Sequence, residues 1–402
     1  MSAVLNDADE RLCSPLSTTE MERRWSLARQ GMRDLGVDAL LVQGLNDFSV
    51  GGFFRWFTGQ QASNVYPRTV LFPLDGPMIA VDNGPLGGST VVDPTDPMNR
   101  GIGRRAFATS VSSVAYTGGY DAEVCAREIT AAGFRRVGLV CGASMSHGFM
   151  AALQNAAGGV EWIDSTDMIE RYKAIKSPEE IAFIRRTAVM QDQVFAKTCA
   201  FIRPGIKEHE VMAYAQYLGQ LLGSEGGIFL GSTAPEGRAA MFRPRSQWGR
   251  EIRQGDTFTL LIENSGPGGY YAELSRTFVL GKASSELIET HRQVVEARQH
   301  TVDRLLPGAD CRAIFEAHNT YMRERGLPEE RRLYGHSQGY DLAERPLLRQ
   351  DETMALEANM LLAVHPTVAN PRVFVTITDN YLLRAGGGPE RLHATEERIF
   401  EL

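Results

Sequence analysis

The segment LLIENSGPGGYYAELSRTFVLG, residues 260–281, joins two strand-forming runs through the turn SGPGG. The glycines and the proline of this turn supply the backbone conformations that a chain reversal needs, so a hairpin is expected, with strands at 257–264 and 270–280. If the turn centres on the proline, Glu263 lies almost opposite Glu273. Two like charges that face each other across paired strands oppose the pairing. The two carboxylates are therefore candidates for a chemical role.

The composition predicts a globular protein that acts on a small molecule or another protein. The chain has 402 residues, 43% of them hydrophobic and 23% charged, which is enough for about two domains with a large core. Its formal net charge is -7 and no run of Lys and Arg occurs, which argues against nucleic acid or an anionic membrane as a partner. No apolar run is long enough to cross a membrane. The acidic first residues and five scattered cysteines favour a cytoplasmic protein with reduced thiols.

The two halves of the chain differ in their patterns of helix and strand signals. The first half begins with a helical pattern from residue 20 that ends at Gly36, and short apolar runs bounded by Gly, Asp or Asn follow, as in an α/β domain. A Lys-Ser-Pro turn then precedes Pro178, a residue suited to the first position of a helix. We place the domain boundary just before this turn, between residues 172 and 173.

The second half mixes blocks of helices with strand pairs, which predicts an α+β domain. The helices are expected near 207–223, 285–305 and 311–326, and further strands near 228–231, 360–365 and 373–383.

Six segments of the chain resemble one family in the correct order. They are ERYKAIKSPEEIAFIRRTA, IRPGIKEHEVMAY, GGYYAELSRTFVLG, LLPGADCRAIFEAHNTYMRERGL, YGHSQG and NMLLAVHPTV. Together they resemble the pita-bread fold of creatinase, prolidase, aminopeptidase P and methionine aminopeptidase. The resemblance implies an N-terminal creatinase-like α/β domain over residues 1–172 and a C-terminal pita-bread catalytic domain over residues 173–402.

The resemblance also shows where this chain departs from the family's metallopeptidases. Those enzymes bind two metal ions through ligands in the order Asp, Asp, His, Glu, Glu, and bridging carboxylates hold the ions about 3.5–4 Å apart. The matching positions of this chain are Leu261, Glu273, His336, His365 and Thr378. Only the histidine is retained, so an ordinary two-metal peptidase is not expected. Two further histidines of the family are replaced by Met241 and Ala343.

Four side chains remain that the fold would bring to one pocket: Glu263, Glu273, His336 and His365. Acid–base chemistry without metal, as the resemblance to creatinase implies, is the preferred interpretation. Two acids that face each other would raise the pKa of one of them, which suits proton transfer. Alternatively, Glu273, His336 and His365 bind a single zinc, iron or manganese ion.

Substrate-binding candidates lie outside this group. Arg238 and Arg243 belong to a loop that lines the active-site mouth in the family, and paired guanidinium donors suit an anionic substrate. Arg68 roughly matches a position from which creatinase's N-terminal domain reaches its partner's pocket, which implies a homodimer. Tyr271 in GYY and Glu344 after GHSQG complete the set. The other histidines are expected at the surface: His147, His209, His291, His300, His318 and His393.

The sequence thus predicts a creatinase-like hydrolase that cleaves a C–N bond of a small, anionic, nitrogen-containing metabolite without the family's two-metal centre. Creatinase's histidine base maps to Met241 and one of its substrate-holding glutamates maps to His365, so creatine itself is not the expected substrate. Two alternatives stay open. One is a mononuclear metal-dependent hydrolase or lyase, and the other is a non-catalytic binding protein on the same scaffold.

Overall fold

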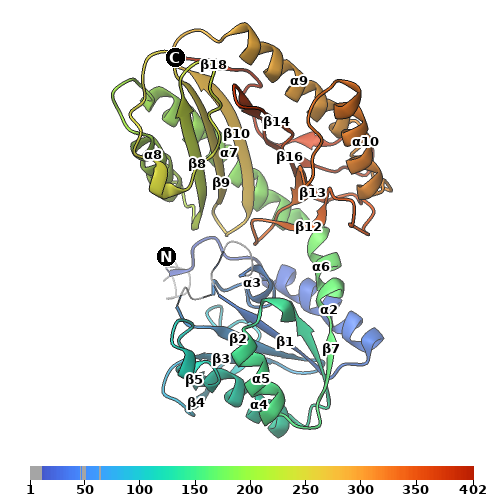
Figure 1. Ribbon diagram of the computed structural model, residues 1–402. Helices are drawn as coiled ribbons and strands as arrows, with labels where there is room; N and C mark the ends of the chain where they lie inside the picture. Colours follow the sequence, from blue (N-terminus) through green and yellow to red (C-terminus); the bar gives the residue numbers. More distant parts are fainter. Residues whose placement is uncertain (1–10, 46, 48–50, 63–64) are drawn as a thin grey trace, which may run out of the picture. The chain divides into compact units, whose positions relative to one another are not determined.

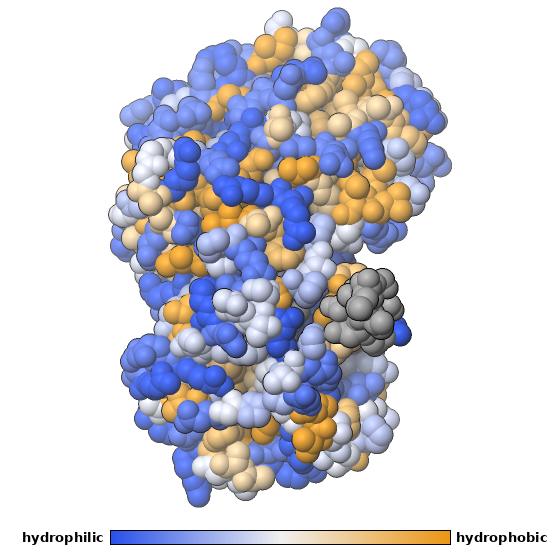
Figure 2. Space-filling view, turned by 180° about the vertical axis from the view of Figure 1, so that it is seen from behind, coloured by the Kyte–Doolittle hydropathy of each residue, from blue (hydrophilic) through white to orange (hydrophobic). Residues whose placement is uncertain are grey.

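The structure is a computed structural model, which describes residues 11–45, 47, 51–62 and 65–402 (Figure 1). The chain forms two compact units that divide between Lys173 and Ala174. On the face drawn in Figure 2, hydrophilic and hydrophobic residues are interspersed over the surface of each unit. Within the described ranges, no helix is both long and apolar enough to cross a membrane.

The first unit is an α/β domain built on a seven-stranded sheet with the order β4-β5-β3-β2-β1-β6-β7. The sheet is mixed, since β2 is antiparallel to both of its neighbours, whereas β1, β6 and β7 run parallel to one another. Its strands are β1 (Ala39–Gly44), β2 (Arg68–Pro73), β3 (Met78–Asn83), β4 (Ser89–Val91), β5 (Ile102–Ala108), β6 (Arg136–Val140) and β7 (Glu161–Asp164). Its helices are α2 (Thr18–Leu35), α3 (Gly52–Thr58), α4 (Tyr120–Ala132), α5 (His147–Ala156) and α6 (Thr166–Ala174), the last of which crosses the boundary.

Local sequence signals set the ends of the helices. Ser17 accepts a hydrogen bond from the backbone N–H of Glu20 and so begins α2, and Gly36 ends it in the left-handed conformation with φ of 66°. In the second unit, Ser177 and Glu180 form a capping box around Pro178, the first residue of α7. The predictions made from Gly36 and Pro178 are confirmed.

The second unit contains three sheets and four long helices. A four-stranded sheet has the order β18-β10-β9-β8, a five-stranded sheet has the order β12-β11-β13-β16-β17, and β14 pairs with β15. The strands are β8 (Gly226–Ala234), β9 (Thr257–Ser265), β10 (Tyr271–Val279), β11 (Gly335–Ser337), β12 (Glu344–Leu347), β13 (Leu361–Val364), β14 (Thr367–Ala369), β15 (Phe374–Thr376), β16 (Asp379–Leu382), β17 (Glu390–Arg391) and β18 (Phe400–Glu401). The helices are α7 (Pro178–Phe201), α8 (Glu208–Leu221), α9 (Ser285–Val302) and α10 (Cys311–Glu324). This mixture of helices and strand pairs is the α+β arrangement that the sequence predicts.

The predicted hairpin is present and fixes which residues face the helices. In β9 and β10, Ile262 and Leu274 belong to the apolar core that also contains residues of α7 and α8. Successive side chains of a strand point to opposite faces of the sheet. Glu263 and Glu273 therefore point away from these helices, on the face where β10 meets the segment before β16.

The prediction of one strand over 373–383 is wrong in one respect, because the chain changes partners within it. Residues before the change form β15, which pairs with β14, and residues after it form β16, which pairs with β13. At the change, the backbone N–H and C=O of Thr378 exchange hydrogen bonds of 3.3 Å with Ser275 of β10. This bridge ties the four-stranded sheet to the rest of the unit.

Two of the histidines expected at the surface are buried. His318 stacks on Tyr334 with ring centroids 3.8 Å apart. His393 bonds through Nε2 to Gln191 at 2.9 Å, and its Nδ1 accepts the backbone N–H of Asn380. Their partners lie far away in sequence, so helical or loop context alone placed both histidines wrongly.

A buried ionic cluster stabilises the second unit. The carboxylate of Asp379 is fully buried and accepts hydrogen bonds from Arg276 at 2.8 Å, Arg298 at 2.5 Å and Arg391 at 3.1 Å. Burial would raise the pKa of Asp379, but the charges of Arg276 and Arg298 outweigh burial and lower it. The carboxylate is therefore the anion that keeps two buried guanidinium groups paired.

Replacement of Asp379 by Asn is expected to destabilise the protein by about 3–5 kcal/mol, because it leaves buried guanidinium groups without their counterion. Guanidinium-induced unfolding measures the change in the free energy of unfolding. The matched control is Asp351→Asn, which removes an exposed pair with Arg349 and should leave stability unchanged. Equal effects of the two substitutions would contradict the structural role of Asp379.

Candidate functional site

The second unit encloses a cavity of about 490 Å³ to which both acids and both imidazoles contribute. Its polar lining includes Glu263, Glu273, His336 and His365, the four residues that the sequence proposed together. The rest of the lining is mixed. It contains apolar residues such as Ile228, Leu230, Leu261, Phe242, Leu342 and Phe374, and also the polar residues Glu330, Arg332, Thr367, Thr376 and Thr378. This volume lies in the usual range of small-molecule sites.

The two acids lie directly opposite each other on β9 and β10. Glu263 is 5% exposed and Glu273 is 3% exposed, so both residues are buried. Opposed side chains on antiparallel strands have Cβ atoms about 5 Å apart. The predicted register is thus confirmed, and it places two acids in one small buried volume.

Each histidine approaches Glu273 from the five-stranded sheet. His336 lies on β11, and its Nε2 is 3.5 Å from Oε2 of Glu273. His365 directly follows β13, and the two imidazole rings are 5.3 Å apart between centroids. One ligand-type atom from each of Glu273, His336 and His365 lies within 4.8 Å of the others.

The hydrogen bond of His336 to the backbone assigns its tautomer. Nδ1 lies 3.0 Å from the carbonyl oxygen of Ser337. A carbonyl can only accept, so Nδ1 carries the proton and Nε2 is the nitrogen directed at Glu273. This orientation leaves Nε2 available for a proton or a cation shared with the carboxylate.

Burial and mutual repulsion separate the two acids in pKa. Burial, and then the negative charge of Glu273, raise the pKa of Glu263 well above its ordinary value. Burial opposes ionisation of Glu273 as well, but the two imidazoles outweigh it and lower the pKa of that carboxyl. Burial lowers the pKa of His365 to about 4, so His365 is neutral at pH 7. The pKa of Glu263 is therefore raised and that of Glu273 is lowered, although the two carboxyl groups face each other.

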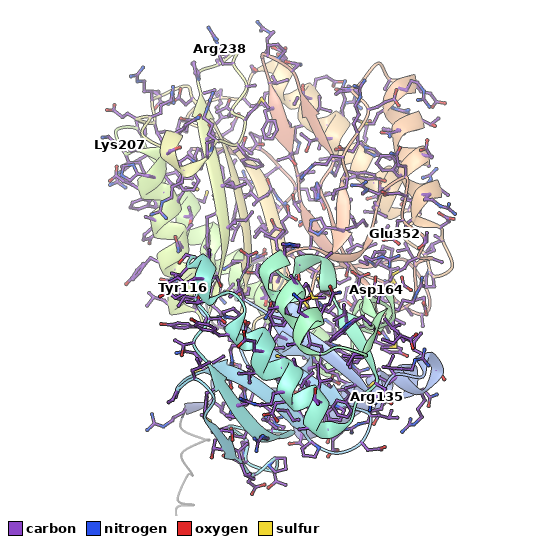
Figure 3. All side chains as sticks on the ribbon, turned by 60° about the horizontal axis from the view of Figure 1, so that its bottom comes forward. Tyr116, Arg135, Asp164, Lys207, Arg238 and Glu352 are labelled. Atoms are coloured by element: carbon purple, nitrogen blue, oxygen red, sulfur yellow. The ribbon has the colours of Figure 1, made fainter. Side chains whose placement is uncertain are left out.

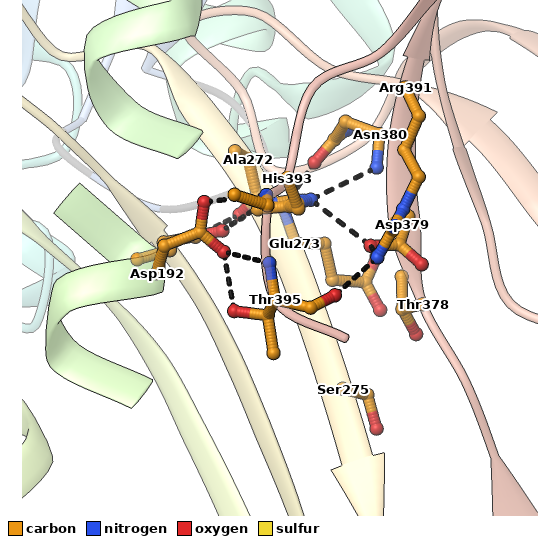
Figure 4. A network of polar contacts seen from close by, with 12 residues as sticks. Asp192, Ala272, Glu273, Ser275, Thr378, Asp379, Asn380, Arg391, His393 and Thr395 are labelled. Carbon is orange, nitrogen blue, oxygen red and sulfur yellow. Dashed lines mark hydrogen bonds and ion pairs between the residues drawn. The ribbon is translucent and has the colours of Figure 1, made fainter. Parts of the chain in front are cut away.

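A chain of amides behind the acids holds them in place. Gln338 Nε2 donates to Oε1 of Glu263 at 2.9 Å, and Asn380 Nδ2 donates to Oε1 of Gln338 at 2.8 Å. The backbone N–H of Glu273 donates to Oδ1 of Asn380 at 2.6 Å. Figure 4 shows His393 in contact with both Asn380 and Asp379, with Glu273 on the neighbouring strand. Both acids therefore share one rigid support.

Sequence reasoning missed Gln338, Asn380 and Arg332, which also lines the cavity. Gln338 belongs to the motif GHSQG, two residues after His336. Its place in this motif is the feature from which its role could have been predicted. Asn380 lies two residues after Thr378, the residue that the resemblance matches to the family's last metal ligand. Arg332 precedes His336 by four residues and carried no pattern of its own.

The remaining sequence candidates lie elsewhere. Arg238 and Arg243 line a neighbouring cavity of about 650 Å³, together with Met241. Arg238 lies at the outer surface of the second unit (Figure 3). Arg68 belongs to the first unit, where its Nε donates to Asp82 at 2.7 Å. None of these arginines is among the residues that line the cavity of Glu263, Glu273, His336 and His365.

Two further candidates, Glu344 and Tyr271, are buried and are not among the residues that line the cavity. Glu344 is 2.7 Å from Nζ of Lys176, so its carboxylate already has a cationic partner. Tyr271 is 5% exposed, and burial raises the pKa of its hydroxyl above the ordinary value. Both residues have structural surroundings that explain them without a substrate.

The residues present fit a single divalent ion but not a pair of ions. Leu261 and Thr378, which the resemblance matches to two of the family's carboxylate ligands, bring no carboxylate to the cavity that they line. By contrast, Oε2 of Glu273 is buried and accepts no hydrogen bond from any described residue. Two imidazoles and this free carboxylate oxygen form a donor set suited to zinc, iron or manganese.

Comparison with known proteins places the second unit among metallopeptidases. Residues 182–385, about half of the chain, match the model of metallopeptidase family M24. A Xaa-Pro dipeptidase of Pyrococcus horikoshii is 26% identical over 259 residues, which cover 64% of this chain and 73% of that protein. A creatinase of a Bacillus species is 24% identical over 401 residues, which cover 92% of this chain and 88% of that protein.

Solved structures agree on the fold over nearly the whole chain. The prolidase of Pyrococcus horikoshii superimposes with a TM-score of 0.76 at 20% identity, covering 94% of this chain and all of that one. A prolidase of Thermococcus sibiricus gives a TM-score of 0.78 at 18% identity, covering 95% of this chain and 99% of that one. The shared architecture therefore extends over both units.

The raised pKa of Glu263 predicts a pH-dependent gain in stability for Glu263→Gln. Above the ordinary value of 4.5, the unfolded chain releases the proton of Glu263 while the folded protein retains it. The folded state then binds more protons, so the stability of the wild type falls as pH rises, by at most about 1.4 kcal/mol per pH unit. Gln removes this loss and still accepts the hydrogen bond of Gln338.

Guanidinium-induced unfolding of the wild type and Glu263→Gln at pH 5 and pH 8 tests this sign. The variant should be the more stable protein, by a margin that is larger at pH 8 than at pH 5. A margin that stays constant or narrows would mean that Glu263 is ionised in the folded protein.

Proposed function

The chain belongs to metallopeptidase family M24, and from that premise we propose that it is an enzyme that hydrolyses a C–N bond of a small nitrogen-containing compound without a two-metal centre. Hydrolysis of C–N bonds is the activity that the family's Xaa-Pro dipeptidases and creatinase have in common. One observation carries the proposal: Glu273, flanked by two imidazoles, lies directly opposite Glu263 in a cavity of small-molecule size.

Glu273, His365 and Glu263 each suit one step of hydrolysis. Oε2 of Glu273, which faces Nε2 of His336 at 3.5 Å, can accept a hydrogen bond from a water molecule and hold it in the cavity. His365 is neutral at pH 7 and partly exposed, so it can accept the proton that this water loses as its oxygen attacks the substrate carbon. Glu263 retains its own proton and can donate it to the departing nitrogen.

A mononuclear metal enzyme is the second candidate, and the donor set of Glu273, His336 and His365 favours it. A single divalent ion held by these residues would polarise the substrate and lower the pKa of a bound water. The same residues would then orient the ion, and Glu263 would still supply a proton to the leaving group.

Metal analysis combined with an activity screen distinguishes the two candidates. The protein is purified without added ions, its metal content is measured, and amides and guanidino acids are screened for release of an amine before and after chelation. Activity that survives chelation in protein with far less than one ion per chain supports the metal-free proposal. About one zinc, iron or manganese per chain, with activity lost on chelation, would instead establish the second candidate. Absence of hydrolysis in both states would reject the proposed function.

Glu273→Gln and His365→Asn are each expected to lower kcat by about 10²–10⁴-fold with a smaller effect on KM, because each removes a group that handles the proton of the attacking water. Steady-state kinetics on a compound identified in the screen measures the loss. The matched control is His147→Asn, an exposed histidine of the first unit, which should retain wild-type rates. Near-normal kcat in either active-site variant would remove that residue from the mechanism.

Homodimerisation through Arg68 and a cytoplasmic location remain predictions. In the described residues Arg68 bonds to Asp82 and to the side chain of Gln60 at 2.9 Å. Its assigned role would need a second copy of the chain, which size measurement in solution can detect.

A further inference from the structure

A buried ion pair of the second unit takes no part in the proposed mechanism. Nζ of Lys176 donates to Oε2 of Glu344 at 2.7 Å, and the two side chains are only 2% and 5% exposed. Lys176 lies two residues after α6, whereas Glu344 begins β12, so the pair joins distant segments of the chain. Taking two charges out of water costs free energy that their attraction seldom exceeds. The selection of one conformation therefore accounts for this pair better than stabilisation does.

Glu344 holds the loop of residues 338–343, which connects β11 to β12. Its Oε1 accepts the backbone N–H of Asp341 at 3.3 Å. A Cβ atom on Gly339 would overlap the carboxylate of Glu344, so the backbone of Gly339 lies directly against that group. Lys176 thus fixes the carboxylate, and the carboxylate fixes the loop.

This loop carries groups that the cavity needs. Gln338, its first residue, donates to Oε1 of Glu263 at 2.9 Å. The carbonyl oxygen of Gly339 accepts the backbone N–H of Tyr271, the first residue of β10, at 2.8 Å. Leu342 and Ala343, its last residues, line the cavity. A shift of the loop would therefore move both the partner of Glu263 and part of the cavity wall.

We propose that Lys176 and Glu344 are positioning residues, which act on the reaction by holding Gln338 against Glu263. This inference rests on the proposed function, because it assumes that Glu263 takes part in a reaction in this cavity. Neither Lys176 nor Glu344 is among the residues that line the cavity, so neither is assigned a contact with the substrate. Misplacement of a reacting group by about 1 Å can lower a rate by about 10²-fold.

Hydrogen exchange measured by mass spectrometry tests the positioning without a substrate. The double variant Lys176→Met/Glu344→Leu removes both charges, so that no single buried charge is left behind. It also removes the acceptor of the Asp341 N–H. In the full-length variant, peptides that cover residues 335–348 should exchange at least about tenfold faster than in the wild type, and thermal unfolding should show that the variant folds.

Lys282→Met/Glu401→Leu is the matched control. Lys282 also lies 2.7 Å from its glutamate, and Glu401 also accepts a backbone N–H, that of Ala283 at 2.9 Å. Neither Lys282 nor Glu401 lines the cavity, so the control should leave exchange over 335–348 unchanged. Equal acceleration in the control would overturn the inference.

Gly339→Ala decides the question if the double variant does not fold. The added methyl group would push the loop away from the carboxylate of Glu344 while both charges remain. Peptides over 335–348 should again exchange faster than in the wild type. Unchanged exchange over 335–348 in whichever of the two variants folds would overturn the inference.

Steady-state kinetics on a compound identified in the screen tests the action through Gln338. The variant Lys176→Met/Glu344→Leu should lower kcat at least about tenfold with a smaller change in KM. Adding Gln338→Met should lower kcat little further, because the two changes remove the same support of Glu263. Fully additive losses would overturn the inference.

The positioning and the proposed function fail separately in this design. Faster exchange over 335–348 in a protein that hydrolyses none of the compounds would sustain the positioning of the loop and reject the hydrolase. Wild-type kcat in Lys176→Met/Glu344→Leu would sustain the hydrolase and overturn the inference.

Discussion

The opposition of Glu263 and Glu273 across β9 and β10 is the constraint on which the site depends. Two charges about 5 Å apart in an environment with an effective dielectric constant of about 20 would repel by about 3 kcal/mol, in addition to the loss of hydration. The two acids respond in opposite directions, since the pKa of Glu263 is raised and the pKa of Glu273 is lowered. Gln338 donates only to Glu263, whereas Glu273 faces the imidazoles. One strand register therefore gives two buried carboxyl groups whose pKa values are shifted in opposite directions.

That arrangement needs rigid support, and the support comes from the C-terminal part of the chain. Asn380 connects the amide of Gln338 to the backbone of Glu273, and the next residue toward the N-terminus, Asp379, anchors three arginines. The change of strand partner at Thr378 is what brings these two residues to β10. Leu261 and Thr378, which the resemblance matches to carboxylate ligands of the family, line the cavity without adding a carboxylate to it.

Features that depend on near neighbours in sequence could be predicted, and those that depend on distant contacts could not. The proline and glycines of SGPGG determine the hairpin and hence the Glu263–Glu273 register. By contrast, the partner of His393 is Gln191, more than two hundred residues away, and the break before β16 depends on Ser275. The position of Arg332 could not be predicted for a related reason. The sequence of a polar loop does not indicate which of its residues line a cavity.

The orientation of His336 limits what can occupy the centre of the site. Its Nδ1 donates to the carbonyl of Ser337, so an unprotonated Nε2 would direct its lone pair at the anionic Glu273 only 3.5 Å away. That contact is repulsive unless one positive charge lies between the two atoms. A proton on Nε2 and a bound divalent ion both meet this requirement. The metal-free and mononuclear mechanisms thus share one electrostatic design, and they differ only in whether a proton or an ion carries the charge that keeps Glu273 ionised.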